Sequence, residues 1–163
     1  MKTARGGFRM PSKEQRMPET EDSHRADAKL PDPARCPKCK ATYLKGPWTW
    51  RPAPENAASH TCPACLRIAD GLPAGYVTLR GAFVPQHRSE VLNLVMARAE
   101  RAKEEHPLQR IMAVETTAEG TLVTTTDTHL ARGIAQALRD AFKGEVSLRY
   151  SKAENLLRAT WTR

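Results

Sequence analysis

No stretch of this 163-residue chain is apolar over the roughly 18 residues that a membrane-spanning helix requires. The first residues, which include Lys2 and Arg5, also lack the apolar run of a secretory signal peptide, so we expect a cytoplasmic protein. Motifs of common enzyme classes are missing: there is no P-loop, G-x-G-x-x-G, H-E-x-x-H or nucleophile elbow. We therefore expect neither an enzyme nor a protein that binds a membrane or a small-molecule substrate.

Cysteine is scarce, and its placement is the most informative feature of the sequence. The four cysteines form two C-P-x-C pairs, Cys36 with Cys39 and Cys62 with Cys65, and 22 residues separate the inner two. A two-residue spacer aims both thiolates at one ion, and C-x₂-C repeated across a gap of roughly 15–20 residues is typical of a tetrahedral Cys₄ zinc site. The spacing predicts one Zn²⁺ per chain, held by a zinc ribbon in which each pair forms a hairpin knuckle.

Other uses of four cysteines fit this sequence less well. Two disulfides suit a secreted protein, and a thioredoxin-like pair requires a βαβ unit that neither C-x-x-C has. A rubredoxin-like Fe(Cys)₄ centre uses the same four ligands. We favour zinc over iron because the surrounding residues are basic and include tryptophan. Four thiolates fill the ligand shell, so we expect His60 on the surface or hydrogen-bonded to a ligand.

Acidic residues are fewer than basic ones, 18 against 26, and the formal net charge of +8 favours a polyanionic partner. Residues 36–75 have the highest ratio, five basic to two acidic. Aromatic and basic side chains interleaved there can stack on unpaired bases and neutralise phosphates, which predicts RNA or a ribosomal subunit as partner. The alternative is that the two indoles cover the zinc knuckles. The residues expected to contact RNA are Lys38, Lys40, Lys45, Trp48, Trp50, Arg51 and Arg67.

Four segments are predicted along the chain. Residues 1–34 hold too few large apolar side chains to offset their backbone entropy, so we expect a disordered leader. Residues 35–75 form the zinc ribbon. Residues 76–108 contain an extended segment and an amphipathic helix that Ser89 caps. Residues 109–163 complete the chain.

The last segment predicts a β-β-α-β-β module. Two strands meet in a hairpin at Gly120, a helix begins after Asp127, and two further strands alternate apolar with polar residues. The fold class is therefore α+β: a Cys₄ zinc ribbon followed by a small β-β-α-β-β sheet module with one additional helix. The sheet face away from the helices would carry Arg149, Arg158 and several threonines, either as its solvated side or as an RNA platform.

The paired C-P-x-C motifs resemble the zinc region of the archaeal and eukaryotic adaptor family that exports the large ribosomal subunit from the nucleus. The runs at 125–132, 142–145 and 158–161 are similar to the small αβ module of its archaeal members. Residues 35–163 are more similar still to short bacterial zinc-ribbon proteins of unassigned function.

The resemblance implies a connection with the ribosome or RNA, in subunit maturation or stress, and implies that the four cysteines are the metal ligands. It does not imply nuclear export, because the family has more zinc-binding cysteines and further domains. The first hypothesis is thus a non-enzymatic zinc-ribbon protein that binds ribosomal or other structured RNA. Two alternatives stay open: a protein–protein adaptor with a structural zinc, and a rubredoxin-like electron carrier.

Overall fold

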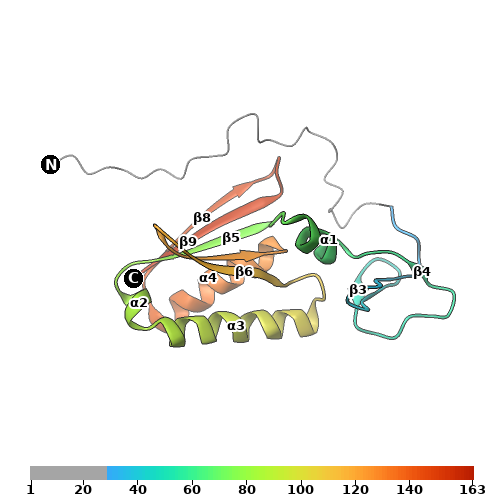
Figure 1. Cartoon of the computed structure of the whole chain (residues 1–163), viewed down its shortest axis with the longest axis horizontal. Helices are drawn as coiled ribbons and strands as arrows, with labels where there is room; N and C mark the ends of the chain where they lie inside the picture. The colour runs from blue at the N-terminus through green and yellow to red at the C-terminus, as the bar shows by residue number, and fades with distance from the viewer. Residues whose placement is uncertain (1–28) are drawn as a thin grey trace.

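The computed structural model describes residues 29–163 and has two sheets and four helices, which confirms the α+β class (Figure 1). The predicted disordered leader lies outside the described residues, apart from residues 29–34. A smaller sheet occupies one end of the molecule, and a larger sheet with two long helices forms the rest. The cysteines belong to the smaller sheet and to the helix that follows it.

The smaller sheet is built from strands of two residues each. They are β1 (Ala34–Arg35), β2 (Thr42–Tyr43), β3 (Trp48–Thr49) and β4 (Ala58–Ser59), in the order β3-β2-β1-β4. The hydrophobic cluster in this part of the chain consists of the buried residues Cys36, Ala41, Trp48, Cys62, Ala64 and Cys65. A core this small offsets little chain entropy by itself, so we expect a bound metal to stabilise this part of the chain.

The second cysteine pair lies at the start of a helix, α1 (Pro63–Asp70), and not in a hairpin, so that part of the ribbon prediction is wrong. The helix begins here because Cys62 has an extended backbone and its sulfur accepts a hydrogen bond from the Cys65 N–H at 3.4 Å. Pro63 takes the first helical position, where its missing N–H costs nothing. Gly71, at φ +63°, ends the helix in the left-handed conformation.

The larger sheet has five strands, one more than the predicted module. They are β5 (Gly75–Arg80), β6 (Ile111–Thr117), β7 (Gly120–Thr125), β8 (Glu145–Ser151) and β9 (Leu156–Thr162), in the order β6-β7-β5-β9-β8. Both expected hairpins are present, and the additional strand, β5, lies at the centre. It pairs antiparallel with β7 and parallel with β9. Val77 and Leu79 are fully buried between half-buried neighbours, the pattern of a strand with one face covered.

Two long helices cover one face of this sheet (Figure 1). The short helix α2 (Phe83–Gln86) leads into α3 (Arg88–Glu105), and α4 (Thr128–Phe142) packs against α3 and against β9 and β5. As predicted, Asp127 caps α4, accepting from the Leu130 N–H at 3.0 Å. Ser89 does not cap α3, which begins one residue earlier with no side-chain cap. Among the helices of residues 29–163, none combines the length and apolar character that crossing a membrane takes.

The position of β5 leads to a test of the core. Leu79→Ala removes a fully buried side chain from the central strand and should lower the free energy of unfolding by about 2–5 kcal/mol. Leu148→Ala makes the same change on the edge strand β8, where the side chain is 37% exposed, and should cost less than about 1 kcal/mol. Urea unfolding followed by circular dichroism measures both; equal costs would contradict a central, buried β5.

Candidate metal centre

The structure brings all four cysteines together. Their sulfurs lie within 4.8 Å of one another, and the Sγ atoms of Cys39 and Cys62 are 3.7 Å apart. A tetrahedral zinc with Zn–S bonds of about 2.3 Å separates its sulfurs by about 3.8 Å, whereas a disulfide needs about 2.05 Å. All four cysteines are free. The cluster therefore fits one tetrahedrally coordinated metal ion, as the spacing predicted.

A tight turn positions the first pair. The Cys36 N–H donates to the Ala41 carbonyl at 2.9 Å, and the Lys40 N–H donates to the Cys36 carbonyl at 3.0 Å. Lys40 adopts φ +69°, which reverses the chain between β1 and β2. Both sulfurs of the pair are thereby turned toward the start of α1.

The helix start positions the second pair and favours negative charge there. The first-turn N–H groups of α1 have no partner inside the helix, and the positive end of the helix dipole lies beside Cys62 and Cys65. No acidic residue occupies the first turn of α1. The thiolates thus occupy the place that an aspartate or glutamate often takes.

The thiols differ in how readily they ionise. Burial disfavours the Cys36 thiolate, but backbone hydrogen bonds from Cys39, Cys62 and Lys38 outweigh it and lower the pKa of Cys36 to about 6. Burial raises the pKa of Cys62 and of Cys65 above the ordinary value for a thiol. Since a metal binds thiolates, loading the site releases protons, and acid opposes it.

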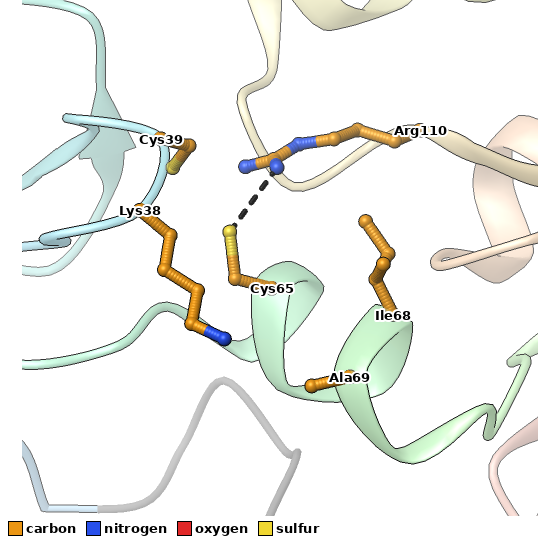
Figure 2. A pocket seen from close by; sticks show the side chains of 6 residues that line it. All are labelled: Lys38, Cys39, Cys65, Ile68, Ala69 and Arg110. Carbon is orange, nitrogen blue, oxygen red and sulfur yellow. Dashed lines mark hydrogen bonds between the residues drawn. The ribbon is translucent and has the colours of Figure 1, made fainter.

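Arg110, between α3 and β6, adds a cation to the cluster. Its guanidinium donates to the sulfur of Cys65 at 3.3 Å (Figure 2) and to that of Cys62 at 3.5 Å, and its Nε donates to the Pro107 carbonyl at 2.8 Å. Burial opposes the charge of Arg110, but its hydrogen bonds to the thiolates of Cys65 and Cys39 raise the pKa of the guanidinium. A divalent ion held by four thiolates has a net charge of −2, and Arg110 offsets part of it.

Sequence reasoning missed Arg110. It lies 45 residues from Cys65 along the chain, and no local pattern separates it from the other arginines. Only the packing of the segment between α3 and β6 against α1 brings it to the sulfurs. A hydrogen-bond donor of this kind orients a metal ligand and lowers the cost of its negative charge.

A pocket of about 280 Å³ opens beside the cluster, lined by residues of the first knuckle, of α1 and by Arg110 (Figure 2). Cys39, the one half-buried cysteine, and Cys65 reach this pocket. Lys38 lines it opposite Arg110, so cations lie on two sides of the thiolates. Solvent reaches the metal site by way of Cys39. The complete lining is Lys38, Cys39, Cys65, Ile68, Ala69 and Arg110.

Trp50 connects the cysteine region to the larger sheet's helices. Its indole N–H donates to the Lys103 carbonyl at 2.7 Å, in the last turn of α3, and the Arg110 guanidinium lies 6.0 Å from its ring centroid. This hydrogen bond provides a donor for a carbonyl at the helix end, which has no N–H partner within the helix. The side chain is still 38% exposed, so part of the ring faces solvent.

Two of the residues predicted to contact RNA are buried in the structure. Trp48 is only 7% exposed and packs against Tyr43, with ring centroids 5.6 Å apart, inside the core that contains the cysteines. Arg67 is also 7% exposed and donates to the Leu72 carbonyl at 3.2 Å, just after α1. RNA contact by these two residues stays a prediction that their burial disfavours, and the burial of Trp48 favours the alternative that an indole covers the knuckles.

The remaining predicted cations are exposed. Lys38, Lys40, Lys45 and Arg51 lie on the surface of the smaller sheet and its loops. The Lys40 ammonium donates to the Pro37 carbonyl at 2.9 Å. His60 is half-buried and is not among the clustered ligands.

Comparison with protein-family models, with curated proteins and with solved structures finds no match to this chain. The resemblance to the ribosomal export adaptor stays a prediction. The assignment of a metal centre rests on the proximity of the four cysteine sulfurs.

Loss of one ligand should empty the site. Purified protein should contain about one metal ion per chain, and Cys62→Ser should contain almost none because three thiolates remain for four positions. His60→Ala removes a nearby imidazole and should keep the metal. Elemental analysis measures the content and identifies the metal. Full metal content in Cys62→Ser would contradict the four-cysteine site.

Loss of Arg110 should weaken the site without emptying it. Arg110→Gln removes the cation beside Cys62 and Cys65, so their thiolates form less readily and protons compete better with the metal. We expect metal affinity to fall roughly 10–100-fold and the pH of half-release to rise. Arg101→Gln, an exposed arginine on α3, is the matched control and should behave like the parent. Chelator competition across a pH series measures both; identical midpoints would contradict a role for Arg110.

Proposed function

We propose that this protein is a cytoplasmic, non-enzymatic zinc protein that binds unpaired regions of ribosomal or other structured RNA. The observation that carries the proposal is the Cys₄ cluster, together with the exposed side chains of Lys38, Lys40, Lys45 and Arg51 in the same part of the chain. The resemblance to the ribosomal export adaptor family supports the same partner.

The role of zinc in this proposal is structural. Four thiolates occupy all positions of a tetrahedral ion, so no position is open for a water or a substrate. The ion would instead fix the two cysteine pairs relative to each other and hold strands of only two residues in place. The loops between the pairs, which display the cations, become rigid as a result.

Charge and geometry support RNA as the partner. Rigid cations reduce the entropy lost on binding a phosphate backbone, and the exposed part of Trp50 lies next to Arg51 in the chain. A base can stack on that part of the indole while Arg51 meets a phosphate. The Asp32 carboxylate accepts a hydrogen bond from the Lys45 backbone N–H at 3.2 Å, and Lys45 itself is exposed.

Removing two of these cations should weaken RNA binding. We expect Lys45→Gln/Arg51→Gln to lower affinity for a single-stranded RNA of about 20 nucleotides and to flatten its salt dependence by about 1.4, since each phosphate contact contributes roughly 0.7 on single strands. Arg132→Gln/Arg139→Gln removes the same charge from the exposed side of α4 and should bind like the parent. Fluorescence anisotropy at several salt concentrations measures the difference.

Metal content and melting temperature should stay at parental values in both double variants, because none of the four side chains is buried. Parental RNA binding by Lys45→Gln/Arg51→Gln would contradict this interface and favour the protein–protein adaptor. Sedimentation of tagged protein through a lysate gradient tests the ribosomal part of the proposal: the protein should migrate with a ribosomal subunit.

A further inference from the structure

The four cysteines differ in how easily a reagent in solution can reach them. Cys36 and Cys62 have no exposed surface and Cys65 is 7% exposed, whereas Cys39 is half-buried. The pocket of about 280 Å³ beside the cluster is lined by Cys39 and Cys65 (Figure 2). A small reagent that enters this pocket therefore meets Cys39 as the least covered of the four cysteines.

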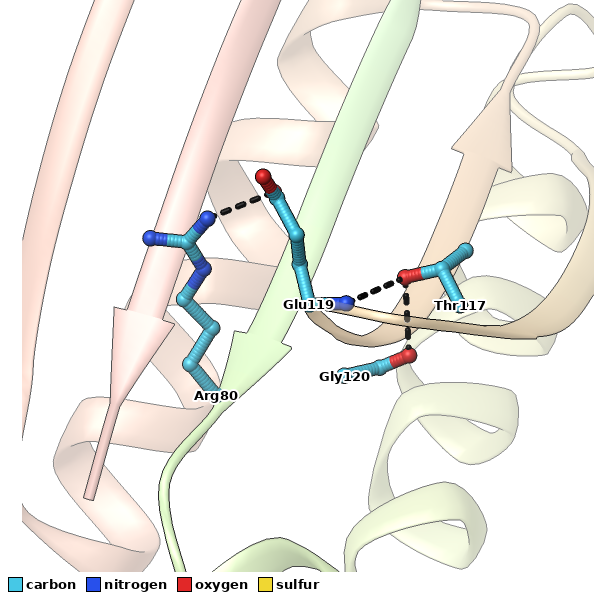
Figure 3. Close-up of polar contacts among 4 residues, drawn as sticks. All are labelled: Arg80, Thr117, Glu119 and Gly120. Atoms are coloured by element: carbon cyan, nitrogen blue, oxygen red, sulfur yellow. Dashed lines mark hydrogen bonds and ion pairs between the residues drawn. The ribbon is translucent and has the colours of Figure 1, made fainter. Parts of the chain in front are cut away.

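The charges around this pocket favour attack by a sulfur on an oxidant. Lys38 and Arg110 line the pocket, and its lining contains no carboxylate. Two cations attract an anionic reagent and offset the charge of an anion that leaves during a reaction. Arg80 shows the contrasting case, because its guanidinium is paired with the Glu119 carboxylate beside the β6–β7 turn (Figure 3).

The sulfur of Cys62 lies where a second reaction step would need it. Its Sγ atom is 3.7 Å from that of Cys39, and a disulfide bond is about 2.05 Å long, so the two atoms have to approach by only about 1.7 Å. Cys39 belongs to the first cysteine pair and Cys62 to the second. A disulfide between them would take one metal ligand from each pair.

We propose that Cys39 is a site of oxidative modification through which a peroxide releases the metal. As a metal ligand Cys39 is a thiolate, and its sulfur attacks one oxygen of hydrogen peroxide. The O–O bond breaks, an S–O bond forms and hydroxide leaves, which gives a sulfenic acid. The thiolate of Cys62 then attacks the oxidised sulfur, an S–S bond forms, the S–O bond breaks and a second hydroxide leaves.

This sequence of steps balances and has a structural consequence. Two thiolates lose two electrons in total, and one peroxide is reduced to two hydroxide ions. The metal ion keeps only two of its four sulfur ligands, so it leaves the site. The region with strands of two residues then loses the ion that stabilises it. Reduction of the disulfide by an added thiol restores the four ligands. The inference depends on the metal centre and not on RNA as the partner.

The first experiment locates the oxidised cysteine in the full, metal-loaded chain. Hydrogen peroxide is added in the presence of dimedone, which traps sulfenic acids, and mass spectrometry of the digest identifies the labelled residue. We expect the label on Cys39. Without dimedone we expect a disulfide between Cys39 and Cys62, formed at the same rate as metal passes to a chromogenic chelator. A first label on another cysteine, or a first disulfide between any other two cysteines, would overturn the assignment.

The second experiment changes the size of the pocket and keeps all four ligands. Ile68 is 45% exposed and Ala69 is exposed, so substitutions there should leave metal content and melting temperature close to parental values. Ile68→Ala widens the pocket and should speed metal release by peroxide, and Ala69→Leu narrows it and should slow release several-fold. Ala97→Leu makes the same change at an exposed position of α3 and is the matched control.

The slower variant separates access from stability. A less stable protein would lose its metal faster, so slower release by Ala69→Leu at an unchanged melting temperature can come only from reduced access. Release from Ala69→Leu at the rate of the parent and of Ala97→Leu would overturn the pocket as the path of the oxidant.

The third experiment tests the charge of the pocket with two disulfide reagents. Lys38→Gln should slow the reaction of the cluster with the anionic reagent dithionitrobenzoate roughly twofold to fivefold at low salt, because a unit cation near the reacting sulfur is lost. The neutral reagent dithiodipyridine should react as it does with the parent. Arg132→Gln, at an exposed position of α4, removes the same charge elsewhere and is the control. Equal rates of Lys38→Gln and Arg132→Gln with the anionic reagent would contradict the role of Lys38.

The outcomes distinguish this inference from the proposed function. Metal-loaded protein that keeps its metal and its four thiols in excess peroxide would overturn the inference and leave the metal centre in place. Protein purified without any metal would overturn both the centre and the inference. Failure to bind RNA would overturn only the proposed partner, because the oxidation of Cys39 is measured without RNA.

Discussion

The convergence of four cysteine sulfurs on one point is the constraint on which the first part of the described chain depends. The smaller sheet has strands of two residues and a core of six buried residues, three of them cysteines. Closing the loop between Cys39 and Cys62 costs chain entropy that so small a core cannot recover. A metal ion bound by all four sulfurs would join these segments, so we expect metal binding to stabilise the folded form of this region.

Two side chains connect the metal centre to the larger sheet and its helices. Arg110 donates to two of the sulfurs from the segment before β6, and Trp50 donates to a carbonyl at the end of α3. The guanidinium also faces the Trp50 ring. Because each contact joins residues more than 40 positions apart in the chain, the metal centre fixes how the cysteine region sits against α3, and a disturbance at the sulfurs reaches that helix end.

Local sequence patterns predicted most of the helices and strands. Strand pairing between residues far apart in the sequence could not be predicted from such patterns. The cysteine spacing, the Asp127 cap and the two hairpins each depend on residues a few positions apart, and the structure contains all of them. The central place of β5 depends on parallel pairing with β9, whose residues lie about 80 positions later, and no local pattern records it. The start of α1 was missed because C-P-x-C is compatible with a knuckle and with a helix that a cysteine caps.

Composition alone overstates the charge that a partner can meet. A divalent ion held by four thiolates would carry −2 in total and would lower the formal net charge of +8 to +6. In addition, several basic side chains make contacts within the protein. Arg110 faces the sulfurs, Arg67 is buried against the end of α1, and Arg80 is paired with Glu119. The exposed cations lie in the loops of the metal centre, among them Lys38, Lys40, Lys45 and Arg51, and also on α3, α4 and β8. A polyanion that binds this protein has therefore to be recognised by the position of these cations, because the surplus of charge over the whole surface is small.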